Sequence, residues 1–188
     1  MSTILVQPET ATSTWVIDRV HSTAQFKVKH MMISNVLGEF TSITGVLERD
    51  ENDATKSKIR ASIDADTINT RESQRDAHLK SADFFHVEKH PTLTFNSTVI
   101  SKNADGELKV SGDLTIRGVT RNVVFDVEGP SPAQQKDPWG NTRIGLSATT
   151  RISRKDFGLT WNAALEAGGL LVGDAVTITL DVQFIKER

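Results

Sequence analysis

The 188-residue chain contains no cysteine and no tyrosine, and its aromatic residues are limited to 8 Phe and 3 Trp. Without cysteine, the chain cannot form disulfides, cysteine-ligated zinc sites, iron–sulfur clusters or a thiol nucleophile. Five histidines remain as candidate metal ligands, and His86 and His90 have the spacing of a zinc pair on a helix. Pro91 follows His90 directly and disfavours a helix there, so we expect ordinary loop histidines, no metal site and no cofactor.

Neither sign of charge is in clear excess: 22 Lys and Arg stand against 24 Asp and Glu, a formal net charge of −2. This balance gives no global attraction to nucleic acid or to anionic lipid. The longest run without charged residues is the mostly polar stretch 90–101, whereas a membrane-spanning helix needs roughly 18 apolar residues. Residues 1–8 lack the basic and apolar regions of a secretory signal. We therefore expect a cytoplasmic protein without a membrane span.

Side chains with β-branching are abundant: 21 Thr, 16 Val and 13 Ile make up 50 of the 188 residues. Such residues suit a pleated, half-buried surface. Apolar and polar residues alternate with a period of two in several stretches, which predicts strands with one buried face and favours antiparallel pairing. In one of them Leu93, Phe95 and Val99 share the inward parity. The stretches are residues 24–28, 59–65, 93–99, 108–116, 123–127, 144–152 and 176–184, with weaker candidates at 15–17 and 40–47.

Residues 71–80 break this alternation and fit a helix capped by Thr70. Only Ala77 and Leu79 are apolar there, so the helix is expected on the surface or over an opening. Residues 1–13 have no strong pattern and are interpreted as a flexible arm before a single domain at 14–188. About eight or nine strands with one helix fit a sandwich or a closed barrel, and a barrel of eight strands is either filled or holds one small ligand. Periodicity leaves these alternatives open.

Catalytic motifs are scarce in this sequence. No G-x-S-x-G stretch supports a serine hydrolase, and no glycine-rich loop leads from a strand into a helix to hold a phosphate. Arg75, Asp76 and His78 form the one cluster that combines a base, a carboxylate and a cation. It suits acid–base chemistry or anion binding, but the sequence favours a surface helix whose charges pair locally.

Several stretches resemble the YceI-like family in their order and spacing, from about Trp15 to Ile185. They are WVIDRVHS (15–22), FKVKHMMISNVLGEF (26–40), ASIDADTINT (61–70), RDAHLKSADFF (75–85), HPTLTF (90–95), GDLTIRGVTR (112–121), DFG (156–158) and VGDAVTI (172–178).

The resemblance implies an all-β fold: an extended, antiparallel, lipocalin-like β-barrel of about eight strands with one short helical excursion near residues 71–80. It also implies a protein that is not an enzyme and that binds, sequesters or transports a long apolar ligand, such as a polyisoprenoid, an isoprenoid quinone or a fatty amide. A lipid would then be the partner, with no nucleic acid, and a homodimer is possible. Such a site needs a long apolar lumen and a few polar groups at its mouth.

The residues expected to line that lumen come from strand parity and from position near the helix. Parity selects Phe26, Phe40, Phe95, Ile116, Leu146 and Ile178, and position selects Phe84, Phe85 and Trp161. Arg75 and His78 are candidates for the ligand head group, or else they only anchor the helix. Two alternatives remain: an enzyme acting on a hydrophobic small molecule through Arg75, Asp76 and His78, and a structural domain with a filled core.

Overall fold

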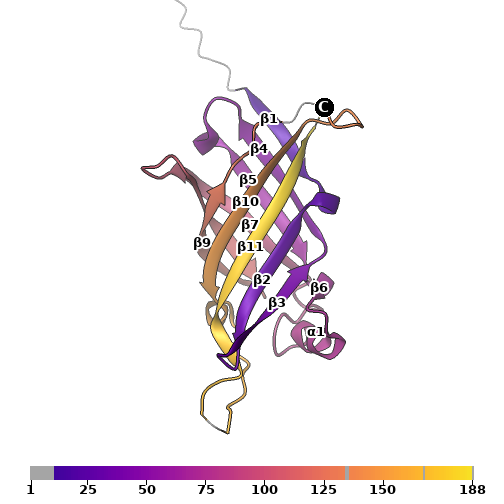
Figure 1. The fold of residues 1–188 in the computed structure, drawn as a ribbon, viewed down its shortest axis with the longest axis vertical. Helices are drawn as coiled ribbons and strands as arrows, with labels where there is room; N and C mark the ends of the chain where they lie inside the picture. The colour runs from indigo at the N-terminus through magenta and orange to yellow at the C-terminus, as the bar shows by residue number, and fades with distance from the viewer. Residues whose placement is uncertain (1–10, 134–135, 167, 188) are drawn as a thin grey trace, which may run out of the picture.

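The computed structural model describes residues 11–133, 136–166 and 168–187. In them eleven strands form one antiparallel sheet with a single α-helix, α1 (Ser73–Lys80), beside it (Figure 1). Within the described ranges, no helix has the length and apolar character needed to cross a membrane. The strands are β1 (Thr12–Ile17), β2 (Thr23–His30), β3 (Ser34–Phe40), β4 (Ile43–Asp50), β5 (Lys58–Asp64), β6 (Ile68–Asn69), β7 (Thr92–Lys102), β8 (Leu108–Ile116), β9 (Val119–Glu128), β10 (Arg143–Ser153) and β11 (Val172–Lys186).

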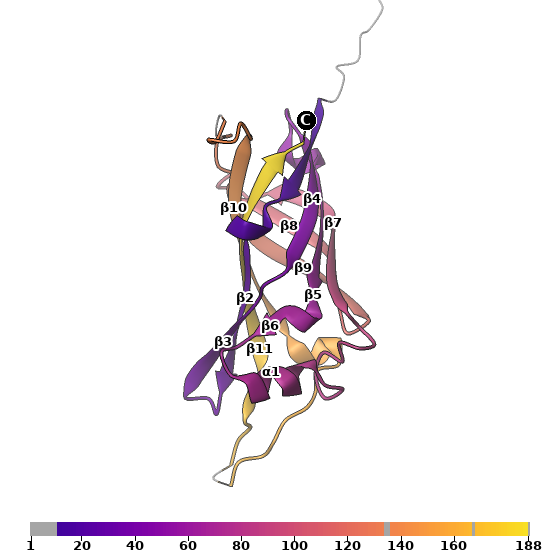
Figure 2. The ribbon, with the colours of Figure 1, turned by 90° about the vertical axis from the view of Figure 1, so that its right-hand side faces the viewer.

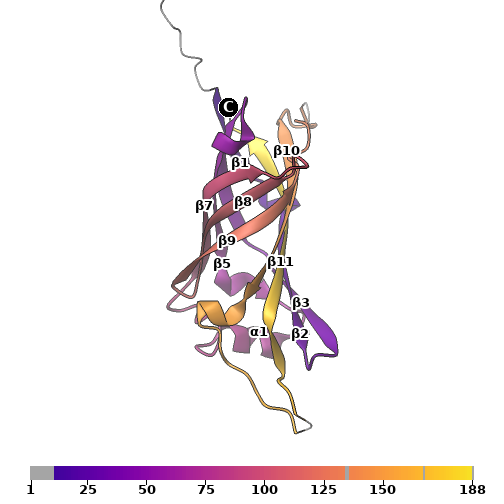
Figure 3. The ribbon, with the colours of Figure 1, turned by 90° about the vertical axis from the view of Figure 1, so that its left-hand side faces the viewer.

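The sheet closes on itself because β1 pairs with the C-terminal end of β11, through Trp15 and Lys186 among others. The ring of pairings runs β1, β4, β5, β7, β8, β9, β10, β11, which confirms the predicted closed barrel. The N-terminal two thirds of β11 pair instead with β2, from Val172 opposite His30 to Asp181 opposite Thr23. The strands β2, β3 and β6 therefore extend the wall beyond the closed ring, as Figures 2 and 3 show from two sides.

The predicted strand phases are confirmed for most of the wall, with one reversal in β7. Val99 was expected to face inward, but it is 58% exposed, and its neighbour Ile100 is 7% exposed. The register between β7 and β8 shifts between Ser97 and Val99, as at a β-bulge. One extra residue reverses the alternation for the rest of the strand, which explains the error.

Two predicted boundaries also change. The first strand begins at Thr12, so Thr12 and Ser13 of the expected arm belong to β1, while residues 1–10 lie outside the described part of the chain. Helix α1 begins at Ser73 and is capped by Glu72, whose carboxylate accepts hydrogen bonds from the amides of Gln74 and Arg75. Thr70 is therefore not the cap.

One end of the barrel, the upper end in Figure 1, is filled by apolar side chains. Trp15, Leu47, Ile144, Val182 and Phe184 form this cluster, and all are buried. The indole N–H of Trp15 donates to Ser13 Oγ over 2.7 Å, and the charged ends of Arg49 and Lys186 lie over its ring. The buried side chains of this cluster close the interior at this end, and the hydrogen bond to Ser13 leaves the indole N–H of Trp15 paired.

An ion-pair network covers the same end. Arg143 donates from Nε to Asp137 over 2.7 Å and from its guanidinium to Asp18, which also contacts His21 over 2.8 Å. Burial opposes ionisation of Asp18, but hydrogen bonds from Arg143, His21 and the Val20 amide outweigh it and lower its pKa to about 2. The network joins the loop after β9 to the chain between β1 and β2.

At the other end of the barrel the wall is incomplete. In the described residues β3 pairs beyond β2 only with the two-residue strand β6, and no pairing joins either strand to β5 or β7. Helix α1 and the segment after it, residues 81–91, lie at this gap (Figure 2). The sequence prediction of a helix over an opening is therefore confirmed.

We expect Asp18→Asn to lower the free energy of unfolding at neutral pH by about 2 kcal/mol, since the folded-state pKa lies well below that of the unfolded chain. A carboxylate with a depressed pKa stabilises the fold above its unfolded pKa and loses that contribution as pH falls. The difference between wild type and variant should therefore shrink between about pH 5 and about pH 2. Urea titrations across this range measure it. Asp105→Asn, in the exposed turn before β8, is the control. If the stability difference between wild type and Asp18→Asn did not change with pH, the low pKa of Asp18 would be contradicted.

Candidate functional site: an apolar cavity inside the barrel

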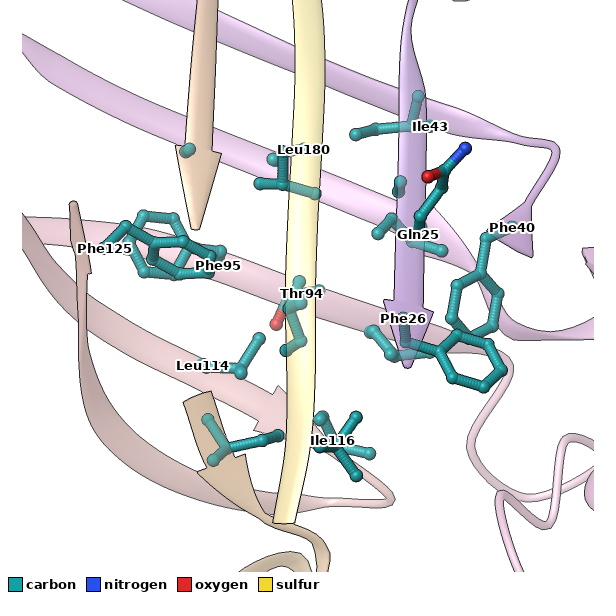
Figure 4. A pocket seen from close by; sticks show the side chains of 18 of the residues that line it. Gln25, Phe26, Phe40, Ile43, Thr94, Phe95, Leu114, Ile116, Phe125 and Leu180 are labelled. Carbon is teal, nitrogen blue, oxygen red and sulfur yellow. The ribbon is translucent and has the colours of Figure 1, made fainter. Parts of the chain in front are cut away.

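Between its filled upper end and the helix, the barrel holds a partly open cavity of about 210 Å³. Ten of the eleven strands, helix α1 and the segment after it contribute to its wall, and 29 of the 32 lining residues are apolar. The remaining three are Gln25, Thr94 and Arg154. In Figure 4, the rings of Phe95 and Phe125 lie together on one side of the cavity and those of Phe26 and Phe40 on another.

Two glycines make room for these aromatic rings. A Cβ atom added to Gly112 would lie 2.4 Å from the Phe95 ring, and one added to Gly38 would lie 2.3 Å from the Phe26 ring. Each ring therefore occupies the place where a neighbouring strand lacks a side chain. Because the rings lie against the wall, they take up less of the barrel interior, and the cavity between them stays open.

The structure brings eight of the nine predicted lumen residues to the cavity. Phe84 and Phe85 reach it through the gap beside α1, and the other six point inward from the strands, as parity predicted. Trp161 does not line the cavity; it is partly buried and packs against Phe84, with ring centroids 5.4 Å apart. Whether the eight residues contact a ligand stays a prediction. The eight are Phe26, Phe40, Phe84, Phe85, Phe95, Ile116, Leu146 and Ile178.

The three helix residues singled out from the sequence, Arg75, Asp76 and His78, do not line the cavity either. Asp76 accepts hydrogen bonds from the amide and the hydroxyl of Thr70, and Arg75 donates to the Thr70 hydroxyl over 2.7 Å and to its carbonyl over 2.8 Å. His78 contacts Asp83 over 2.8 Å and stands edge-on to Trp161, 4.6 Å between ring centroids. Their contacts in the structure are those of anchors, which hold α1 to the chain on either side of it.

Arg154 is the residue that sequence reasoning missed. Only 5% exposed, it lies at the lower end of the cavity, between β10 and β11. It donates from Nε to the carbonyl of Gly173 and from Nη1 to those of Leu159 and Trp161, over 2.5 to 2.9 Å. Burial lowers the pKa of the guanidinium, and Asp174 opposes this from 3.5 Å. The sequence does indicate this position, because residue 154 continues the alternation that directs Ile144, Leu146, Ala148 and Ile152 inward.

A second arginine holds the segment that fills the gap. Arg117, in the turn between β8 and β9, donates to the carbonyl of Ala82 over 2.7 Å and to that of Gly158 over 3.0 Å. It therefore ties the end of α1 to the turn after β10. Together with Arg154, it holds the lower end of the barrel chiefly through hydrogen bonds to backbone carbonyls.

The site offers apolar surface and few reactive groups. Among the described residues no group of three His, Asp or Glu side chains is placed to hold a metal ion. The one buried cation at the cavity, Arg154, has its donors directed at backbone carbonyls. The arrangement suits burial of an apolar molecule, whose binding free energy comes from the area removed from water.

Comparison with known proteins agrees with this geometry. The model of the YceI-like domain matches residues 15–184. A UPF0312 protein of Staphylococcus aureus is 36% identical over 171 residues, 90% of this chain and 96% of its own. The YCEI protein of Campylobacter jejuni has a similar structure, with a TM-score of 0.70, 31% identity and coverage of 86% and 91% of the two chains. A polyisoprenoid binding domain of Saccharophagus degradans, 15% identical with a TM-score of 0.64 over 92% of this chain and 98% of its own, shares the fold.

We expect Arg154→Lys to lower the free energy of unfolding by about 3 kcal/mol, because one ammonium group cannot reach both the Gly173 carbonyl on β11 and the Trp161 carbonyl in the β10–β11 connection. Lys155→Met is the matched control: Lys155 also pairs with Asp174, over 2.8 Å, but its side chain is 45% exposed. Its loss should cost less than about 0.5 kcal/mol. Urea unfolding at neutral pH measures the free energy of unfolding of both variants. Equal losses would show that the hydrogen bonds of Arg154 contribute no more stability than the exposed ion pair of Lys155.

Proposed function

Since this chain belongs to the YceI-like family, we propose that it binds a long apolar molecule inside its barrel, without catalysing a reaction on it. The observation that carries the proposal is the cavity inside the barrel, in which 29 of the 32 lining residues are apolar. A structural domain with a filled core would not leave such a space, because protein interiors are normally close-packed.

We further propose that the ligand is a polyisoprenoid, an isoprenoid quinone or a fatty amide, which the protein sequesters or carries. The polyisoprenoid-binding neighbour supports this class, although its 15% identity shows only a shared fold. The wall supports it chemically: phenylalanine and aliphatic side chains offer a branched hydrocarbon close contact and almost no hydrogen bonds. A polar ligand would leave its own donors and acceptors unpaired there.

An enzyme acting on a hydrophobic small molecule is the second candidate, and the helix contacts count against it. It needs Arg75, Asp76 and His78 within reach of the cavity. None of them lines the cavity, and their polar atoms contact Thr70 and Asp83. The same contacts favour the anchoring role over the head-group role for Arg75 and His78.

Native mass spectrometry of gently purified protein, followed by solvent extraction, tests the proposal directly. We expect an adduct that denaturation releases and that extraction identifies as a long apolar lipid. Delipidated protein should then take up an isoprenoid quinone with saturation at one molecule per barrel. Protein that carries no lipid and shows no saturable uptake would contradict the proposal.

A pair of adjacent substitutions in β10 tests whether uptake occurs in the cavity. Ala148 is buried and lines the cavity, and Thr149, next to it, is exposed on the outer face. We expect Ala148→Phe to fill the cavity and weaken quinone uptake by more than about tenfold, and Thr149→Phe to leave it within about twofold. Thermal unfolding of both variants controls for stability. Equal uptake by the two folded variants would place the ligand elsewhere.

A further inference from the structure

The lower end of the barrel carries a cluster of exposed apolar side chains. The turn between β2 and β3 exposes Met31, Met32 and Ile33, the last two at 62% and 79%. Leu37 on β3 is 66% exposed, and Leu170, on the neighbouring connection into β11, is also exposed. The Met31 amide donates to the carbonyl of Leu171 over 2.7 Å, so the two segments lie side by side. Figures 1 and 3 show both at the same end of the molecule.

The turn has residues that its own backbone does not favour. Met31 and Met32 both have positive φ, 51° and 62°, and the Ile33 amide donates to the His30 carbonyl across them over 3.1 Å. Turns with positive φ at both central residues favour Asn-Gly, because bulky side chains disfavour positive φ. Stability of the hairpin therefore does not explain two methionines here, and their exposure points to a contact outside the chain.

The charged side chains of the hairpin around this turn, residues 23–38, are all positive. Residues 19–38 contain Arg19, Lys27 and Lys29 and no Asp or Glu. Lys27 and Lys29 are exposed on the outer face of β2, and Lys27 lies opposite Leu37 in the β2–β3 pairing. On β11, the strand that pairs with β2, the carboxylate of Asp174 forms an ion pair with Lys155 over 2.8 Å. The chain as a whole carries a net charge of −2, so this is a local arrangement rather than a general basic character.

The same end of the molecule reaches the cavity. Val28 and Val172 both line it, and they lie three residues before Met31 and two residues after Leu170. A surface that contacted the exposed turn would therefore lie close to the lower end of the lumen.

We propose that the β2–β3 turn, Met31–Ile33 with Leu37 and Leu170, docks onto the surface of a membrane that contains anionic lipid. The apolar side chains enter the boundary between head groups and acyl chains, and Lys27 and Lys29 contact the lipid phosphates. An anionic membrane fits better than a protein groove, because the hairpin around the turn, which carries most of the exposed apolar side chains, has only basic charged residues, and the exposed acid Glu166 lies on the neighbouring loop. The proposal concerns a surface outside the cavity and does not depend on the proposed function.

The test is sedimentation of the full chain with vesicles of phosphatidylcholine mixed with phosphatidylglycerol, and with vesicles of phosphatidylcholine alone. We expect binding to the anionic vesicles that weakens with added salt. The double variant Met31→Asn, Met32→Gly should bind at least about tenfold more weakly. It should fold at least as stably as wild type, since it supplies the residues that this turn favours. Lys27→Gln and Lys29→Gln should each weaken binding about fivefold and reduce its salt dependence.

Trp139→Ser is the matched control, because Trp139 is the exposed aromatic residue of the loop before β10, at the opposite end of the barrel. We expect it to bind as wild type does. The proposal is overturned if wild type ignores anionic vesicles, if the turn variants bind unchanged, or if only Trp139→Ser loses binding. It is also overturned if the double variant instead converts a dimer to a monomer in light scattering without any change in sedimentation. Quinone uptake without vesicles tests the proposed function separately, so either result can fail alone.

Discussion

Closure of the hydrogen-bonded wall is the constraint on which the rest of this structure depends. Once β1 pairs with β11, the ring of strands meets the hydrogen-bonding needs of its own backbone. The interior then needs no polar side chains, so it can be lined almost wholly by apolar residues. Large side chains on an apolar wall would fill the interior if they all pointed to its centre. The rings of Phe95 and Phe26 instead lie against the wall, because each occupies the site of a missing Cβ on the adjacent strand.

The two ends of the barrel are closed by different means. The upper end has continuous strands and is closed by packing around Trp15, with Arg143 joining two carboxylates outside it. The lower end lacks strand pairing between β3 and β5, so a helix and a loop must complete the wall. Loops expose unpaired carbonyls, and Arg117 and Arg154 bind several of them at once. The upper end is therefore closed by side-chain packing, whereas the packing of Phe84 and Phe85 at the lower end is supported by arginine contacts to the backbone.

Much of this architecture follows from the sequence, because a period of two is a direct consequence of strand geometry. Parity placed Phe95, Leu146 and Ile178 correctly on the inner face. It failed at Val99, since a bulge changes the phase without leaving a mark in the composition. Parity also places residue 154 on the inner face. Because Arg154 is charged, however, the sequence pattern there is that of a strand that has ended. The side on which Trp161 packs depends on a loop, which no periodicity describes.

A cavity of this kind accepts ligands more readily than it distinguishes them. Burial of hydrocarbon stabilises a complex by about 25 cal/mol for each Å² removed from water, whichever chain supplies the area. Discrimination needs polar groups, and of the three at the cavity Arg154 is directed at backbone carbonyls and Gln25 lies largely in solvent. With no tyrosine in the chain, no phenol can take their place. Selection among apolar ligands in the proposed function therefore rests on length and cross-section, which the Phe–Gly contacts of the wall define.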